Sequence, residues 1–231
     1  MPEAAIVTTL VLAVLAHRLR AVTTGAAAVG LALGLATALA TSYAPWALFV
    51  LFVISGSTAS RLGADRKRAL GVLQADEGRR GIEHALANCG AAALLVLLGR
   101  QGFLDAVLAD LMAAGSLAAV FADTMASEFG TWLGGRPRDL LTLRTVPVGR
   151  DGAVTPIGLL AAAIAASLAG AIAALPSGRF GAALAVAAGG FAGNLVDSLL
   201  GSTIESRLGR YGGSIVNFCC SLAGAGVAAI V

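Results

Sequence analysis

The sequence is poor in charged, aromatic and cysteine residues. Of its 231 residues only 13% are Asp, Glu, Lys or Arg and 5% are aromatic, while 58% are hydrophobic. A soluble domain carries about 25% charged residues, so this composition, with a mean hydropathy of +0.86, excludes an ordinary soluble protein. The three cysteines are Cys89, which stands alone, and the adjacent Cys219 and Cys220. Such spacing fits neither a zinc site nor a disulfide framework.

Several common functional motifs are also missing. No Gly-Lys-Ser/Thr follows a glycine loop, which excludes a Walker phosphate loop. Nothing supports a serine or cysteine nucleophile, a haem, an iron–sulfur cluster or a Rossmann loop. The net charge is only +3 and lies in short loops, so we expect no nucleic-acid partner. Glu3 precedes the first apolar run and basic residues follow it, the reverse of a secretory signal, so we expect no signal peptide.

Long apolar runs occupy most of the chain and predict membrane helices of about 20 residues each. We therefore expect an all-α fold, a polytopic membrane helix bundle of about eight (seven to nine) transmembrane helices in a single domain, residues 1–231. The expected spans are 4–20, 21–41, 46–60, 84–99, 103–129, 154–175, 181–203 and 214–231.

Basic residues gather on one side of this arrangement. All but Arg100 and Arg179 of the 16 Lys and Arg residues follow spans one, three, five and seven. The positive-inside rule then makes the loops at about 61–83, 130–153 and 204–213 cytoplasmic and places both termini outside. We expect a bacterial-type plasma (inner) membrane protein, in contact with membrane lipids, whose site faces the cytoplasm.

Carboxylates interrupt two of the apolar spans, Asp123 and Glu128 in one and Asp197 in the other. A carboxylate at membrane depth is costly unless it meets a cation, a partner or water. We expect these three to be catalytic residues and ligands of Mg²⁺, with phosphate oxygens and water completing its octahedron. Glu205, at the end of the second span, is a further candidate. The alternative is ion pairing with arginines of the neighbouring loops.

Other polar positions near these carboxylates could bind phosphate groups. The loop at 142–152 could form an anion-binding concavity at a helix start, although an ordinary turn is the alternative. The candidate asparagines could instead bond a neighbouring helix, and the basic residues could be orientation signals or contact anionic lipid. The candidates are Lys67, Arg80, Asn88, Thr124, Ser127, Arg144, Gly149, Arg150, Gly152, Asn194, Ser198 and Asn217.

Five segments together resemble the family that includes transmembrane protein 19 and the plant phytyl-phosphate kinase. They are HALANCG at 84–90, ADTMASEFG at 122–130, LLTLRTVPVGRDGAVTPIG at 140–158, GNLVDSLLGSTIES at 193–206 and VNF at 216–218. The resemblance implies a membrane kinase that uses Mg²⁺ and a nucleoside triphosphate (CTP or ATP). Its acceptor would be an isoprenyl monophosphate of the phytyl or geranylgeranyl type, converted to the diphosphate.

The resemblance also assigns the family's polar positions, and it has departures. The matching polar positions are Asn88, Asp123, Thr124, Ser127, Glu128, Asp197 and Ser198. His84, Cys89 and Met125 stand where the family has Gln, Gly and Trp, and the last segment lacks an acidic residue before Asn217.

Two other functions remain open at this stage. One is a nucleotidyltransferase that acts on a lipid phosphate and releases pyrophosphate; the other is a transporter of a lipid phosphate or an anion. The polar residues crowd towards one membrane face, which favours an enzyme over a transport pathway. The sequence leaves open the nucleotide, the prenyl length, the number of metal ions and whether the chain forms a homodimer.

Overall fold

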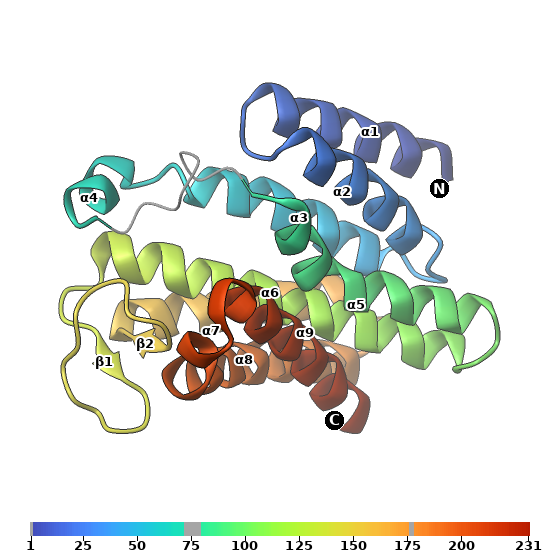
Figure 1. Cartoon of the computed structure of the whole chain (residues 1–231). Coiled ribbons are helices and arrows are strands. Elements are labelled where there is room, and N and C mark those ends of the chain that lie inside the picture. Colours follow the sequence, from blue (N-terminus) through green and yellow to red (C-terminus); the bar gives the residue numbers. More distant parts are fainter. Residues whose placement is uncertain (1, 72–79, 176–177) are drawn as a thin grey trace.

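The chain folds into a bundle of helices with one small hairpin (Figure 1). The computed structural model describes residues 2–71, 80–175 and 178–231. Within these ranges the helices are α1 (Pro2–Arg18), α2 (Thr24–Thr37), α3 (Ala44–Ala59), α4 (Ala64–Ala69), α5 (Ile82–Arg100), α6 (Ala106–Leu133), α7 (Pro156–Ala174), α8 (Phe180–Thr203) and α9 (Gly212–Ile230). Strands β1 (Arg138–Asp139) and β2 (Ala153–Val154) pair antiparallel, and two 3₁₀ turns, Glu205–Arg207 and Gly209–Tyr211, join α8 to α9.

The predicted membrane bundle is confirmed. Each expected span corresponds to one helix, and in the described part of the chain α5 to α9 are long and apolar enough to cross a membrane, while α2 and α3 are shorter apolar helices. Both termini lie at the end of the bundle away from α4 and the hairpin (Figure 1). The side of the membrane that each end faces stays a prediction.

The loop boundaries differ from the expected ones by a few residues. Helix α6 continues to Leu133 and stops at Gly134–Gly135, where Gly135 adopts φ +69°, because a glycine enters the left-handed region without steric cost. The first basic loop contains α4, and residues 72–79 of the expected 61–83 loop lie outside the described residues.

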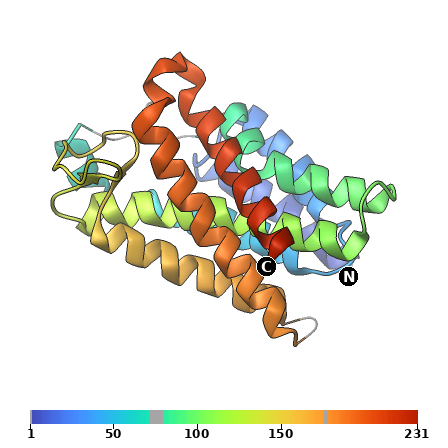
Figure 2. The ribbon, with the colours of Figure 1, turned by 90° about the horizontal axis from the view of Figure 1, so that it is seen from below.

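Helix α6 is the centre of the bundle, packed against α3, α5, α7, α8 and α9. It starts at Asp105, whose carboxylate caps the helix by accepting from the backbone N–H of Val107 and Leu108. The residues in its middle are mostly small and buried, and the side chains of Ala113, Ala118 and Ala119 are each 0% exposed. Small residues let membrane helices approach closely, and the three helices α6, α8 and α9 do so in both views (Figures 1 and 2).

Helices α1 and α2 form an outer layer on this core, with α2 packed on α5 and α1 packed on α2. The turn between them is tied to the rest of the chain by its backbone: Thr23 N–H donates to the carbonyl of Arg80, and Arg80 N–H donates to the carbonyl of Ala21. The outer layer is therefore fixed to the start of α5 at one end of the bundle.

Candidate functional site

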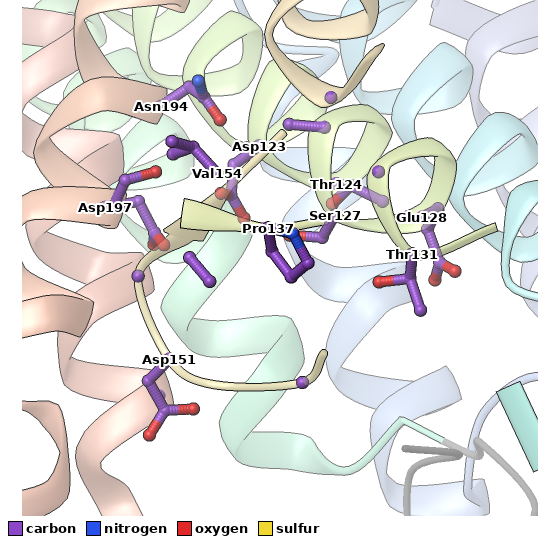
Figure 3. A pocket seen from close by; sticks show the side chains of 18 of the residues that line it. Asp123, Thr124, Ser127, Glu128, Thr131, Pro137, Asp151, Val154, Asn194 and Asp197 are labelled. Carbon is purple, nitrogen blue, oxygen red and sulfur yellow. The ribbon is translucent and has the colours of Figure 1, made fainter. Parts of the chain in front are cut away.

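A polar cavity of about 530 Å³ opens at the end of the bundle that carries α4 and the hairpin. Side chains from α3 to α9 and from the loop between α6 and α7 line it. Ligand pockets usually measure about 300–1,000 Å³, so this one has room for a small molecule. Figure 3 shows Asn194 and Asp197 of α8 on one side of it and Glu128 and Thr131 of α6 on the other.

Asp123 of α6 and Asp197 of α8 point into the same space (Figure 3), and both line the cavity. The two carboxylates lie close together because α6 and α8 touch one helical turn before them, where a Cβ placed on Gly193 would collide with the Cβ of Ala119. Ala119 precedes Asp123 by four residues, and Gly193 precedes Asp197 by four, so each carboxylate lies on the same face as this contact. The close approach of two helix backbones therefore brings the carboxylates together.

Two buried polar atoms of α8 have no hydrogen-bond partner: Oδ2 of Asp197 and Nδ2 of Asn194. Buried polar atoms in proteins are nearly always satisfied, so an unpaired carboxylate oxygen beside a second carboxylate fits a cation. Among the residues described, no group of three or more His, Cys, Asp or Glu side chains could hold a metal by itself. Two carboxylates suit Mg²⁺ only when substrate oxygens and water complete the shell.

The opposite side of the cavity is cationic and has Glu128 at its centre. Lys67 of α4 forms an ion pair with Glu128, and both side chains are largely buried, at 7% and 19% exposure. The hydroxyl of Ser60 donates to Oε1 of Glu128 over 2.8 Å, and Nη2 of Arg80 lies 4.0 Å from the same oxygen. Glu128 is therefore surrounded by cations, and its role as a metal ligand stays a prediction.

Arg80 is held from several directions. Its Nη2 donates to Oγ of Ser60 over 3.3 Å, and its guanidinium lies 5.9 Å from the centre of the Phe52 ring. Its backbone is pinned to the turn between α1 and α2. His84 and Asn88 line the cavity beside it, as their four-residue spacing on one helix face predicts.

The loop from Pro137 to Thr155 closes the cavity on the outside. Asp139 folds its first part, because its carboxylate accepts from the N–H and the hydroxyl of Thr142 and from the N–H of Leu141. The Thr142 backbone and side-chain hydrogen bonds, followed by the Leu141 bond, lower the pKa of Asp139. This carboxylate therefore stays ionised and keeps the loop folded at neutral pH.

The same loop docks on α8 through Gly152. Ser202 Oγ donates to the carbonyl of Gly152 over 3.2 Å, and Gly152 adopts φ +71°. A Cβ at this position would collide with the carbonyl of Ser198 and with backbone and side-chain atoms of Ser202. Only glycine fits a position with both this conformation and this contact.

Glu205 follows α8 and borders the cavity. Partial burial raises its pKa to about 7, and the charges of Asp151 and Asp197 act in the same direction. Glu205 is thus poised to change charge near neutral pH.

The structure gathers almost all of the predicted site residues around this one cavity. Those that line it are Lys67, Arg80, Asn88, Asp123, Thr124, Ser127, Glu128, Gly149, Arg150, Gly152, Asn194, Asp197, Ser198 and Asn217. Arg144 is the exception, since its side chain is exposed and lies outside the lining. Its backbone carbonyl accepts a hydrogen bond from Asp139 N–H in the folded loop.

The structure adds residues that the sequence did not single out as site residues, chiefly Ser60, Thr131 and Pro137. Ser60 is the most informative, because it contacts both Glu128 and Arg80. A serine at the end of an apolar helix carries no signal by itself. Its role depends on α6 lying beside α3.

The fold and the cavity define a polytopic helical membrane protein with a charged pocket at one end of the bundle. The family model described as "Integral membrane protein DUF92" matches residues 7–225, and the chain belongs to this family.

The chain is also similar to several curated proteins over about half of its length. It is 35% identical to uncharacterized membrane protein MJ0933 of Methanocaldococcus jannaschii over 123 residues, 53% of this chain and 49% of the relative. It is 31% identical to Protein PGR of Arabidopsis thaliana over 136 residues, 54% of this chain and 47% of the relative. The third, uncharacterized membrane protein sll0875 of Synechocystis, is 34% identical over 120 residues, 51% and 45% of the two chains. The chain spans about half the length of these relatives. No solved structure matches the chain.

Proposed function

We propose that the protein is a membrane kinase that transfers the terminal phosphate of a nucleoside triphosphate to an isoprenyl monophosphate. One observation carries the proposal: a carboxylate pair with an unpaired buried oxygen faces a cationic cluster across one cavity in an otherwise apolar bundle. Phosphoryl transfer requires mainly positioned charges of both signs around the phosphates. The motif resemblance described above supports the same activity.

In this reaction a phosphate oxygen of the acceptor attacks the terminal phosphorus of the nucleotide. The bond from that phosphorus to its bridging oxygen breaks, and the nucleoside diphosphate leaves with the electron pair. A phosphate monoester has a second pKa near 6, so the acceptor is mostly a dianion at neutral pH and requires no strong general base. The products are the lipid diphosphate and the nucleoside diphosphate.

The acidic residues would hold the metal ion, and the basic residues would bind the phosphate groups. Asp123 and Asp197 would hold Mg²⁺, which supplies charge neutralisation between the phosphates. Arg80 and Lys67 would bind phosphate oxygens, and Arg150 lies at the outer edge of the same cavity. Glu128 positions Arg80 and Lys67 through its contacts with both. The basic loops around the cavity favour a cytoplasm-facing site, where nucleotides are available.

The test uses the purified protein in detergent with Mg²⁺, labelled CTP or ATP, and geranylgeranyl monophosphate. We expect lipid diphosphate and nucleoside diphosphate, with a loss of about a hundredfold or more in Asp123→Asn and Asp197→Asn, because the ligand charge disappears without a change of shape. Arg144→Gln is the matched control outside the cavity and should retain activity. Release of pyrophosphate would indicate nucleotidyl transfer instead. Full activity in either Asp variant would overturn the assignment.

A further inference from the structure

A second cavity lies beside the polar one, enclosed by α1, α2, α3 and α5. It measures about 80 Å³, and its walls are mostly apolar, with Ala13, Gly30, Leu33, Phe49 and Phe52 among them. The buried hydroxyl of Thr9 in this wall donates to the carbonyl of Ala5 and accepts from Nε1 of Trp46. The Thr9 hydroxyl therefore needs no hydrogen bond from a polar ligand in the cavity.

The two cavities share a boundary. Arg80, His84 and Asn88 line both of them. A ligand that crosses this boundary would keep a charged group near the Arg80 guanidinium and pass an apolar segment between α1, α2 and α5. The outer surface of α1 exposes apolar side chains such as Val7, Val11 and Val14, so a long segment could continue into the surrounding lipid.

We propose that the small cavity binds the hydrocarbon chain of the lipid monophosphate next to its phosphate group. The inference rests on the proposed function for the class of ligand, and it adds the place where the chain is held. An amphiphile with an anionic head and an apolar chain matches the order of the walls from one cavity to the next: the carboxylate pair, the cationic cluster, the boundary residues and the apolar cavity. A nucleotide or free phosphate would leave the apolar part empty.

Gly30 of α2 gives a direct means of testing this. A Cβ at Gly30 meets no atom within 4 Å, so a larger side chain can project into the cavity without displacing the helix. Gly30→Leu should fill the space, and Ala13→Leu should fill it from α1. Gly226→Leu on α9 is the matched control, because a Cβ there also meets nothing within 4 Å and Gly226 lines neither cavity.

Trp46 provides the signal, since its indole bonds Thr9 in the cavity wall. The chain has two tryptophans, and Trp132 packs beside Phe129. Trp132→Phe therefore leaves Trp46 as the single tryptophan, whose emission can be excited selectively over that of the two tyrosines. We would titrate this protein in detergent with geranylgeranyl monophosphate, dimethylallyl monophosphate and inorganic phosphate.

We expect geranylgeranyl monophosphate to change the Trp46 emission and inorganic phosphate to leave it unchanged. Gly30→Leu and Ala13→Leu should weaken binding of the long-chain ligand by about tenfold, the effect of displacing about two methylene groups from an apolar site. Inorganic phosphate should bind all variants alike by calorimetry, which also shows that they are folded. Dimethylallyl monophosphate, whose single prenyl unit lies next to its phosphate, should lose affinity in the cavity variants as the long-chain ligand does. Gly226→Leu should bind like the parent protein.

Two results would overturn the inference: no Trp46 response to the long-chain ligand, or cavity variants that bind it as tightly as Gly226→Leu. The kinase proposal is tested separately by product formation. Binding of the hydrocarbon chain without formation of lipid diphosphate would refute the kinase proposal alone. Lipid diphosphate formed with the same KM for geranylgeranyl monophosphate in Gly30→Leu and the parent would refute the chain site alone.

Discussion

Replacing Glu128 with Gln should destabilise the protein strongly, because it leaves two cations without their shared counter-charge. The separation of 4.0 Å between Arg80 and Glu128 corresponds to a Coulomb energy of about 4 kcal/mol at an effective dielectric constant of about 20. Desolvation offsets part of this energy, and removing one partner of a buried ion pair costs about 3–5 kcal/mol. Since Glu128 keeps 19% exposure, we expect about 3 kcal/mol, the lower end of that range.

Thermal unfolding in detergent can measure this change. For a chain of this size 1 kcal/mol shifts the melting temperature by about 2–4 °C, so Glu128→Gln should melt about 6–12 °C lower than the parent. The fluorescence of Trp132 is a suitable probe, because its ring packs against Gly63 immediately before α4, the helix that carries Lys67.

Asp65→Asn is the matched control for Glu128→Gln. Asp65 pairs with Arg68 on the same short helix, but both side chains are exposed, so this change should leave the melting temperature unaltered. Adding Lys67→Met to Glu128→Gln should cost less than the sum of the two single changes, because the second removes a charge that the first left unpaired. Equal melting temperatures for Glu128→Gln and Asp65→Asn would refute the reasoning.

Two further predictions concern the outer side of the cavity. Gly152→Ala should release the loop from α8, which would be seen as faster trypsin cleavage after Arg150. The control is Gly135→Ala, which shares the positive φ but meets no neighbouring atom, so it should cost only the backbone strain of about 1 kcal/mol. Equal cleavage of both variants would contradict the docking contact. Glu205→Gln should change the pH dependence of stability when this is measured in the absence of divalent cations. The pKa of Glu205 in the folded state is raised to about 7, so the folded state holds a proton that the unfolded state releases. The parent therefore loses stability as the pH rises from about 5 to about 7. The melting temperature of the variant should fall less over that range, and parallel curves for the two proteins would count against the raised pKa.

The helices were predictable because the apolar runs are long and the interruptions between them are polar. Each expected span matched one helix, including α6, whose start at Asp105 is a recognisable cap. The ends were less predictable: nothing in Thr131-Trp132-Leu133 stops a helix, and α6 runs on to the glycines beyond. The short helix α4 lies in a charged segment, where periodicity is a weak guide.

Much of the site could be predicted because charge inside an apolar helix is rare and costly. This reasoning identified Asp123 and Asp197, which the fold places face to face. It could not identify the partners of Glu128, because Ser60 and Lys67 approach it only through the packing of α3 and α4 on α6. It could not tell that Arg144 lies outside the cavity lining, because a loop's sequence does not reveal which of its side chains face a cavity.

The contact between Gly193 and Ala119 makes a residue without a side chain responsible for the spacing of two acids. Any larger residue at position 193 would wedge α6 and α8 apart and separate Asp123 from Asp197, although both acids would still be present. A search for important positions by their chemical groups alone would overlook Gly193. The separation of the two carboxylates is set by how closely two helix backbones pack one turn deeper in the bundle.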